Sequence, residues 1–192
     1  MTIYIVAEKI VNNIKCKIMI KLCKIKNNLY SAEIKDINEI QDFIIFAWKE
    51  FFHNQTKEKI ISKRKDLQKI TKFYKNRNGN FWYLKKDNII IATIAVHEIL
   101  FKKKKVGFLR RFIVNKNYRN KGFGSEMLKF VENYAYQKNW EYLMFGIDKN
   151  MEKSKCFYFK NGYKEFYKNI PQEILDDNDA WYLKKKININ TF

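Results

Sequence analysis

The sequence predicts a single α/β (α+β) domain, and three observations lead to this fold class. Its 192 residues are the length of one domain. Segments that alternate apolar and polar residues are interspersed with segments of helical spacing, and the second half reads strand–helix–strand. A hydrophobic fraction of 46% with 17% aromatic residues excludes a disordered chain, and six glycines with one proline exclude a collagen-like or linker-rich one.

The first half is expected to hold a short strand and two helices. The strand covers residues 29–34. The first helix begins after Asp36, which has capping-box spacing with Glu39, and its apolar residues recur at helical spacing: Ile37, Ile40, Ile44, Trp48 and Phe51. The second helix covers residues 56–74, with apolar residues on one face and lysines elsewhere.

Turn signals divide the rest of the chain. They are Asn78-Gly79-Asn80, Asp87-Asn88 and residues 102–105, and they predict antiparallel neighbours. The expected strands are 81–84, 89–99, 106–114, 142–147, 163–168 and 180–187, and the expected helices are 122–139 and 149–160. Residues 1–27 alternate apolar and basic residues in part, so we expect a basic extension or extra strand ahead of a single domain of residues 28–192.

The charge of the chain is unusually positive. Lysine and arginine number 39 against 20 aspartates and glutamates, a formal net charge of +19 at pH 7. Such an excess requires an anionic partner or tolerance of self-repulsion, and it disfavours polycationic substrates. A basic surface with interleaved aromatic residues would suit nucleic acid, although no recognised RNA-binding motif is present.

Cysteines, histidines and apolar runs exclude other classes. Cys16, Cys23 and Cys156 are odd in number and none has CxxC spacing, so we expect reduced thiols and a cytoplasmic location. The histidines, His53 and His97, have no ligand-spaced companions, so we expect no metal site. No apolar run approaches the roughly 18–20 residues of a membrane span, and the start of the chain lacks signal-peptide features.

The most specific pattern is a glycine loop between a strand and a helix. The strand ends at Val114, and the segment Tyr118-Arg119-Asn120-Lys121-Gly122-Phe123-Gly124-Ser125 leads into the helix. Glycines let the backbone approach an anion, and the free N–H groups of the first helical turn point at it. The loop matches neither the dinucleotide-binding Gly-x-Gly-x-x-Gly nor the Gly-Lys-Ser/Thr loop of nucleoside triphosphate sites. It therefore predicts a different phosphate-binding site.

This loop, Arg-x-x-Gly-x-Gly at 119–124, resembles motif A of the GNAT N-acetyltransferases. The segment from Ser154 to Tyr163 resembles the family's second motif, in which a small residue is followed four positions later by Tyr and then by Gly-aromatic. Residues 29–187 can be laid on the family fold. The resemblance implies a mixed, curved sheet of about six or seven strands flanked by about four helices, with two central strands splayed around acetyl-CoA.

The resemblance also implies roles for individual residues. The pyrophosphate would be held by the loop and first helical turn, Arg119, Asn120, Lys121, Gly122, Phe123, Gly124 and Ser125. Phe112, Ile113 and Val114 would run beside the pantetheine arm, and a backbone N–H there would polarise the thioester carbonyl. Tyr158 would protonate the departing thiolate, its alternative being a packed core aromatic. Asn150 is a further candidate for the cofactor, although the family often has Asn at the position that is Met151 here.

The general base and the acceptor are less defined. Residues 106–114 and 142–147 hold no carboxylate, so the nearest candidates for the base are Glu98 and Asp148, each acting through a water; both could equally be surface charges. Because neither strand offers a carboxylate as base, we expect the acceptor to be an α-amine, with a pKa of roughly 7.7–8.0, rather than a lysine side chain, with a pKa of roughly 10.4. Side-chain alternation predicts that one of Arg110 and Arg111 faces the cleft and that the other faces away. The arginine in the cleft would bind a carboxylate or phosphate of the acceptor, its alternative being an arginine packed along the sheet under a helix.

The sequence therefore predicts an N-acetyltransferase that moves an acetyl group from acetyl-CoA to a primary amine of a small molecule or peptide by direct attack in a ternary complex. Two alternatives remain open. One is acetylation of an amine carried by RNA, such as an aminoacyl-tRNA, and the other is an inactive module that binds acyl-CoA or nucleic acid. Homodimers are common among folds of this kind.

Overall fold

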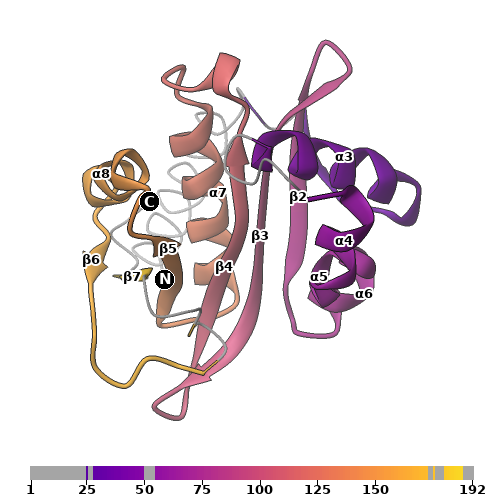
Figure 1. Ribbon diagram of the computed structural model, residues 1–192. Coiled ribbons are helices and arrows are strands. Elements are labelled where there is room, and N and C mark those ends of the chain that lie inside the picture. The colour runs from indigo at the N-terminus through magenta and orange to yellow at the C-terminus, as the bar shows by residue number, and fades with distance from the viewer. Residues whose placement is uncertain (1–24, 26–27, 50–54, 173–174, 176–179, 188–192) are drawn as a thin grey trace, which may run out of the picture.

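A seven-stranded mixed sheet forms the centre of the molecule (Figure 1). The computed structural model describes residues 25, 28–49, 55–172, 175 and 180–187. The strands are β1 (Leu29–Ser31), β2 (Asn80–Lys86), β3 (Ile89–Phe101), β4 (Lys104–Val114), β5 (Tyr142–Asp148), β6 (Lys164–Glu165) and β7 (Ala180–Lys186). Their order is β1-β2-β3-β4-β5-β7-β6, and β4 with β5 is the parallel pair. The predicted extension of residues 1–27 lies outside the described residues, Ile25 excepted.

Two tight turns set the register of β2, β3 and β4. Asp87 and Asn88 connect β2 to β3 with φ of 50° and 61°, and Lys102 and Lys103 connect β3 to β4 with φ of 50° and 62°. Two successive left-handed residues are typical of turns whose twist matches that of the paired strands. The antiparallel neighbours predicted from the turn residues are confirmed.

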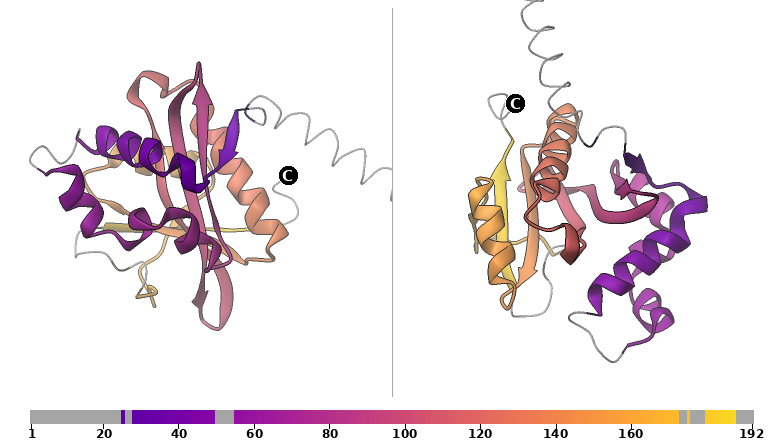
Figure 2. Two further views of the ribbon diagram at one scale, coloured as in Figure 1. Left: turned by 90° about the vertical axis from the view of Figure 1, so that its right-hand side faces the viewer. Right: turned by 90° about the horizontal axis from the view of Figure 1, so that it is seen from above.

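Six α-helices of the described residues cover the two faces of the sheet: α3 (Ile37–Trp48), α4 (Lys57–Ser62), α5 (Lys65–Gln68), α6 (Ile70–Lys75), α7 (Phe123–Gln137) and α8 (Glu152–Lys160). Helices α3, α5 and α6 pack on one face through residues that include Ile44, Leu67 and Ile70. Helix α7 packs on the other face through Met127 and Val131. We call these the α3 face and the α7 face. Seen from above, α8 with β5 and β7 stands on one side of the molecule and α3 to α6 on the other (Figure 2). None of the helices in the described part of the chain is long and apolar enough to cross a membrane.

The single helix predicted over residues 56–74 is wrong, because this segment forms α4, α5 and α6. Thr56 caps α4 as its hydroxyl accepts from the Lys59 N–H at 3.3 Å. Lys69, at φ −138° and ψ 60°, separates α5 from α6. The breaks turn Asp66 and Leu67 together into the interior, where they are buried. The spacing of apolar residues does not reveal such breaks, because the apolar residues of α4, α5 and α6 keep the spacing of one continuous helix.

The start of α3 also differs from the prediction. The capping box joins Glu33 to Asp36 around a 3₁₀ turn, Ile34–Asp36, and the Asp36 carboxylate accepts from the Glu33 N–H at 2.9 Å. The expected partner, Glu39, instead pairs with Lys85 on β2 at 2.8 Å. Because the 3₁₀ turn occupies residues 34–36, the first strand ends at Ser31 rather than at residue 34.

Strand β7 completes the sheet beside β5. It inserts between β5 and β6 and pairs with β5 from Tyr142, opposite Lys186, to Asp148, opposite Ala180. The Lys185 ammonium on β7 lies 2.9 Å from the carboxylate of Glu132 on α7. Burial raises the pKa of Glu132, and the hydrogen bond and charge of Lys185 oppose that rise. The pair therefore ties β7 to the helix on the α7 face.

We predict that Gly79→Ala destabilises the fold. A β-carbon at Gly79 would lie 2.0 Å from the Val96 carbonyl oxygen and 2.6 Å from the His97 Cα, so backbone must move. We expect the free energy of unfolding to fall by about 1–3 kcal/mol in urea titrations. The matched control is Gly124→Ala, whose β-carbon would meet nothing nearer than 3.5 Å and should change stability by less than about 0.5 kcal/mol. Equal unfolding midpoints for the two variants would contradict this prediction.

Candidate active site

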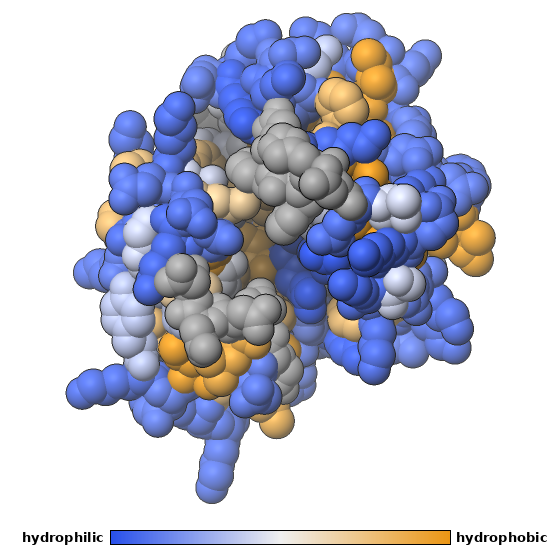
Figure 3. Space-filling view, in the orientation of Figure 1, coloured by the Kyte–Doolittle hydropathy of each residue, from blue (hydrophilic) through white to orange (hydrophobic). Residues whose placement is uncertain are grey.

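Strands β4 and β5 pair at only two positions and then part. Gly107 lies opposite Leu143 and Phe108 opposite Met144, and these are the paired positions of the two strands within the described residues. An open pocket of about 120 Å³ lies at this separation, lined by Phe108, Leu109, Arg110, Arg111 and Gly146. The face of the molecule shown in Figure 3 is mainly hydrophilic and is hollowed near its centre. The splayed central strands predicted from the sequence are confirmed.

Arg111 forms a β-bulge in β4. Its φ is 50°, in the left-handed region. Ala95 on β3 opposes Arg110 and Thr93 opposes Ile113, so two residues of β4 face one of β3 between them. The Thr93 hydroxyl donates to the Arg111 carbonyl oxygen at 2.9 Å, which holds the bulge in place.

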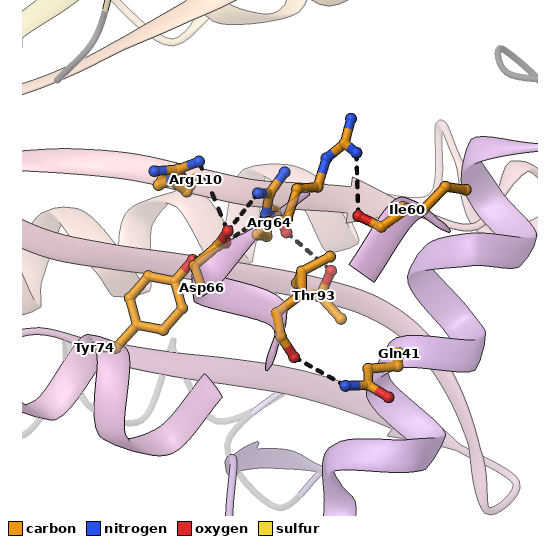
Figure 4. Close-up of polar contacts among 9 residues, drawn as sticks. Gln41, Ile60, Arg64, Asp66, Tyr74, Thr93 and Arg110 are labelled. Atoms are coloured by element: carbon orange, nitrogen blue, oxygen red, sulfur yellow. Dashed lines mark hydrogen bonds and ion pairs between the residues drawn. The ribbon is translucent and has the colours of Figure 1, made fainter. Parts of the chain in front are cut away.

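The bulge overturns the prediction that Arg110 and Arg111 face opposite sides of the sheet. Both guanidinium groups approach the Asp66 carboxylate of α5 on the α3 face (Figure 4). Arg111 donates from Nε and Nη2 at 2.7 Å each, whereas Arg110 Nη2 lies 3.8 Å from Oδ1. The Tyr74 hydroxyl donates to Oδ2 at 2.9 Å. Asp66 was not among the predicted site residues, because only the breaks around α5 turn it inward.

Asp66 is charged although it is only 2% exposed. Burial alone would raise its pKa, but the hydrogen bond and charge of Arg111, helped by Arg110 and Tyr74, lower the pKa to about 2. One carboxylate therefore faces two guanidinium groups at neutral pH.

The glycine loop leads from the end of β4 into α7. Asn120 and Gly122 adopt left-handed φ of 61° and 89°, and Gly122 stands at the N-cap of α7 without a side-chain capping bond. A β-carbon at Gly122 would meet nothing within 4 Å, so the space beside the first turn is open. Arg119 Nε donates to the Val114 carbonyl at 2.9 Å, and Lys121 lies 5.3 Å from the Tyr118 ring. The N–H groups of the first turn with these two cations form a site that fits a phosphate.

Tyr158 lies on α8 in an aromatic cluster on the opposite side of β4 from Asp66. Its ring centroid is 4.2 Å from that of Phe145 on β5 and 6.2 Å from that of Phe112 on β4. A β-carbon at Gly124 would touch Phe157 at 3.5 Å and Phe112 at 3.7 Å, so the loop, β4 and α8 meet here. Burial raises the pKa of Tyr158, which keeps its phenol protonated at neutral pH.

Glu98, one predicted base, lies elsewhere. Its carboxylate accepts from Trp140 Nε1 at 2.9 Å and Asn78 Nδ2 at 2.7 Å, and Lys105 Nζ lies at 3.4 Å. Burial alone would raise the pKa of Glu98, but these donors lower it. Glu98 does not line the pocket, and its position indicates that it joins β3 to the end of α7 rather than accepting a substrate proton.

Asp148, the other predicted base, ends β5. Residues two apart on a strand share a face, so Asp148 lies on the same side of β5 as the pocket residue Gly146. It is exposed, and its carboxylate accepts from the Asn150 N–H at 2.8 Å in the turn that leads to α8. Asn150 is exposed in that turn. Asp148 therefore remains a candidate for the base at the wide end of the gap.

Comparisons with known proteins agree with this arrangement. The model of the family described as "Acetyltransferase (GNAT) family" matches residues 41–163. Among curated proteins, none matches the sequence. An acetyltransferase of the GNAT family from Staphylococcus aureus Mu50 is 21% identical with a TM-score of 0.72, over 84% of this chain and 99% of its own.

Two further solved structures are similar in fold. The PaiA N-acetyltransferase of Thermoplasma acidophilum, in complex with coenzyme A, is 19% identical with a TM-score of 0.65, over 82% of this chain and 97% of its own. The ribosomal-protein-S18-alanine N-acetyltransferase of Escherichia coli is 13% identical with a TM-score of 0.59, over 84% of this chain and 94% of its own.

We predict that Asp66→Asn destabilises the protein and changes its response to acid. The pKa of Asp66, lowered to about 2 in the folded state, gives a stabilisation that is fully present above the unfolded value near 3.8 and is lost as the pH falls through 2. We expect the variant to lose about 3 kcal/mol at neutral pH, since Arg111 is left without its carboxylate, and to show a flatter loss of stability between about pH 4 and 2.

Urea unfolding across this pH range measures both effects. The control is Asp42→Asn, which removes the exposed ion pair with Lys57 and should cost less than about 1 kcal/mol. If Asp66→Asn lost stability between about pH 4 and 2 as steeply as the wild type, the stabilising role of the charged Asp66 would be contradicted.

Proposed function

Because the chain belongs to the GNAT acetyltransferase family, we propose that it transfers an acetyl group from acetyl-CoA to a primary amine by direct attack in a ternary complex. The observation that carries the proposal is the meeting of three elements at the gap between β4 and β5: the glycine loop, the aromatic cluster with Tyr158, and the pocket that ends at Arg110. Each supplies one requirement of the reaction, respectively a phosphate site, a proton donor and a place for the acceptor.

The cofactor would bind on the α7 face and in the gap. Its pyrophosphate would be held by the N–H groups of Gly122, Phe123, Gly124 and Ser125, with positive charge from Arg119 and Lys121 and backbone from Asn120. The backbone of Phe112, Ile113 and Val114 lies beyond the last paired position of β4 with β5. Its polar groups on that side would bind the pantetheine arm and the thioester carbonyl. Asn150 would lie near the same arm. Acetyl-CoA supplies the activated acetyl group.

Tyr158 would act as the general acid. The amine nitrogen forms a bond to the carbonyl carbon, the carbon–sulfur bond breaks, and the phenol proton passes to the departing sulfur. Tyrosinate then regains a proton from solvent, while the proton of the amine leaves through water to Asp148. Because burial raises the pKa of Tyr158, the phenol carries its proton at neutral pH and has one to give.

We predict that acetyl-CoA raises the melting temperature of the protein. A ligand that binds only the folded state at 100 times its Kd stabilises by about 2.7 kcal/mol. Gly124→Ala should retain the melting temperature of the free protein but weaken binding about 10-fold, since its β-carbon points at Phe112 and Phe157 beside the gap. Thermal shift titrations measure both quantities, and no shift at saturating acetyl-CoA would refute the proposed function.

We predict that Tyr158→Phe lowers kcat for acetyl transfer by about 10²- to 10³-fold, the usual contribution of a general acid. Its KM for acetyl-CoA should change little, because the ring and its packing remain. The assay follows CoA thiol release with an amine acceptor. Tyr30→Phe on the distant β1, where the ring stacks on Tyr83 at 5.4 Å, is the matched control and should keep wild-type kcat. Equal kcat in the two variants would assign Tyr158 to packing alone.

A further inference from the structure

Arg110 lies beside a carboxylate whose oxygens are already hydrogen-bonded to other groups. Asp66 is the one carboxylate within ion-pair distance of Arg110 and Arg111 among the described residues. Its oxygens are already occupied, Oδ2 by Arg111 Nε and the Tyr74 hydroxyl and Oδ1 by Arg111 Nη2. Arg110, at 3.8 Å from Oδ1, is too far for a hydrogen bond. The guanidinium of Arg110 thus keeps both its charge and its donors available.

Arg110 is placed to meet a ligand. Its side chain is 27% exposed, against 11% for that of Arg111. Among the described residues that line the pocket at the gap, Arg110 and Arg111 are the charged ones, and Phe108, Leu109 and Gly146 carry no charge. The guanidinium carbon of Arg110 lies 5.2 Å from the centre of the Phe108 ring, which limits the directions the side chain can take. The described lining therefore combines three uncharged residues with the guanidinium of Arg110, whose donors Asp66 does not take up.

The open pocket of about 120 Å³ has room for a small anionic group with a few carbon atoms. A guanidinium matches carboxylate and phosphate oxygens through paired N–H donors. A polyamine would bring a second positive charge towards Arg110, which would repel it.

The same charge assists the nucleophile. An amine must lose a proton before it attacks, and strands β4 and β5 offer no carboxylate ahead of Asp148. A nearby positive charge disfavours the protonated form of an amine and lowers its pKa. Arg110 would therefore anchor the acceptor and offset the acceptor's own anion, which would otherwise raise the pKa of the nearby amine.

We propose that the acceptor is a compact amine that carries a carboxylate or phosphate close to its nucleophilic nitrogen, and that Arg110 binds this oxoanion in the pocket between β4 and β5. Arg111 is a positioning residue, since its bidentate pair with Asp66 fixes the bulge from which Arg110 extends. The inference rests on the proposed acetyl transfer and names its acceptor class.

The test compares matched amines as acceptors with acetyl-CoA. One arm pairs α-, β- and γ-amino carboxylates with their amides, and a second pairs 2-aminoethyl phosphate with 2-aminoethanol. We expect wild-type kcat/KM to favour the anionic member of at least one pair by 10-fold or more. A preference in the first arm would identify the anion as a carboxylate, and one in the second arm would identify it as a phosphate. Among the amino carboxylates, the chain length with the highest kcat/KM gives the spacing between amine and anion.

Variants connect that preference to Arg110. Arg110→Gln should lower kcat/KM for the preferred anionic acceptor about 10- to 100-fold, mainly through KM, and leave the neutral analogue within about 3-fold. Arg110→Lys should recover part of the loss. Arg77→Gln removes the same charge from an exposed arginine stacked on Phe73, outside the pocket, and should leave the preference unchanged.

The outcomes separate this inference from the proposed function. Acetylation of amines without preference for the anionic member, or an equal loss for both members in Arg110→Gln, overturns the inference and leaves acetyl transfer standing. An acetyl-CoA thermal shift without turnover of any anionic probe up to its solubility limit also overturns it. Absence of the thermal shift refutes both.

Discussion

The left-handed backbone at Arg111 is the constraint on which the rest of the site depends. An L-residue in this conformation costs roughly 1–2 kcal/mol, so it persists only where other contacts hold it. Two contacts do so here: the Thr93 hydroxyl binds the Arg111 carbonyl, and the Asp66 carboxylate binds the Arg111 guanidinium at two points. Both partners are buried, and each comes from a different element, β3 and α5. The left-handed conformation of Arg111 is thus held by contacts from both the sheet and a helix of the α3 face.

Because of the bulge at Arg111, the two faces of β4 carry different kinds of side chain. Before the bulge, Arg110 points to the α3 face, and after it Phe112 points to the α7 face, where Tyr158 and the glycine loop lie. With strict alternation Arg111 would instead have crowded the aromatic cluster. The bulge therefore keeps positive charge away from the apolar surroundings of Tyr158 and concentrates it where the proposed acceptor enters.

Local patterns predicted local structure well. Asp87-Asn88 predicted the hairpin because two adjacent residues with left-handed φ are usually Asn, Asp or Gly. The glycine loop was recognisable because the residues that would bind phosphate are consecutive. The bulge was missed because arginine at φ 50° carries no sequence signal and its partner Asp66 lies 45 residues away. Asp66 itself was hidden in a segment with unbroken helical spacing. The surroundings of Glu98 could not be predicted because its three donors come from separate turns and strands, which only the fold brings together.

The position of β7 has a consequence for the order of events during synthesis. This strand leaves the ribosome after all the other described strands, yet it lies inside the sheet, between β5 and β6. Until residues 180–186 emerge, β5 presents an unpaired edge, and Glu132 on α7 lacks the ammonium that neutralises it. Exposed edges pair readily with other chains. A nascent chain halted before β7 would therefore expose the edge of β5 and be an aggregation-prone intermediate.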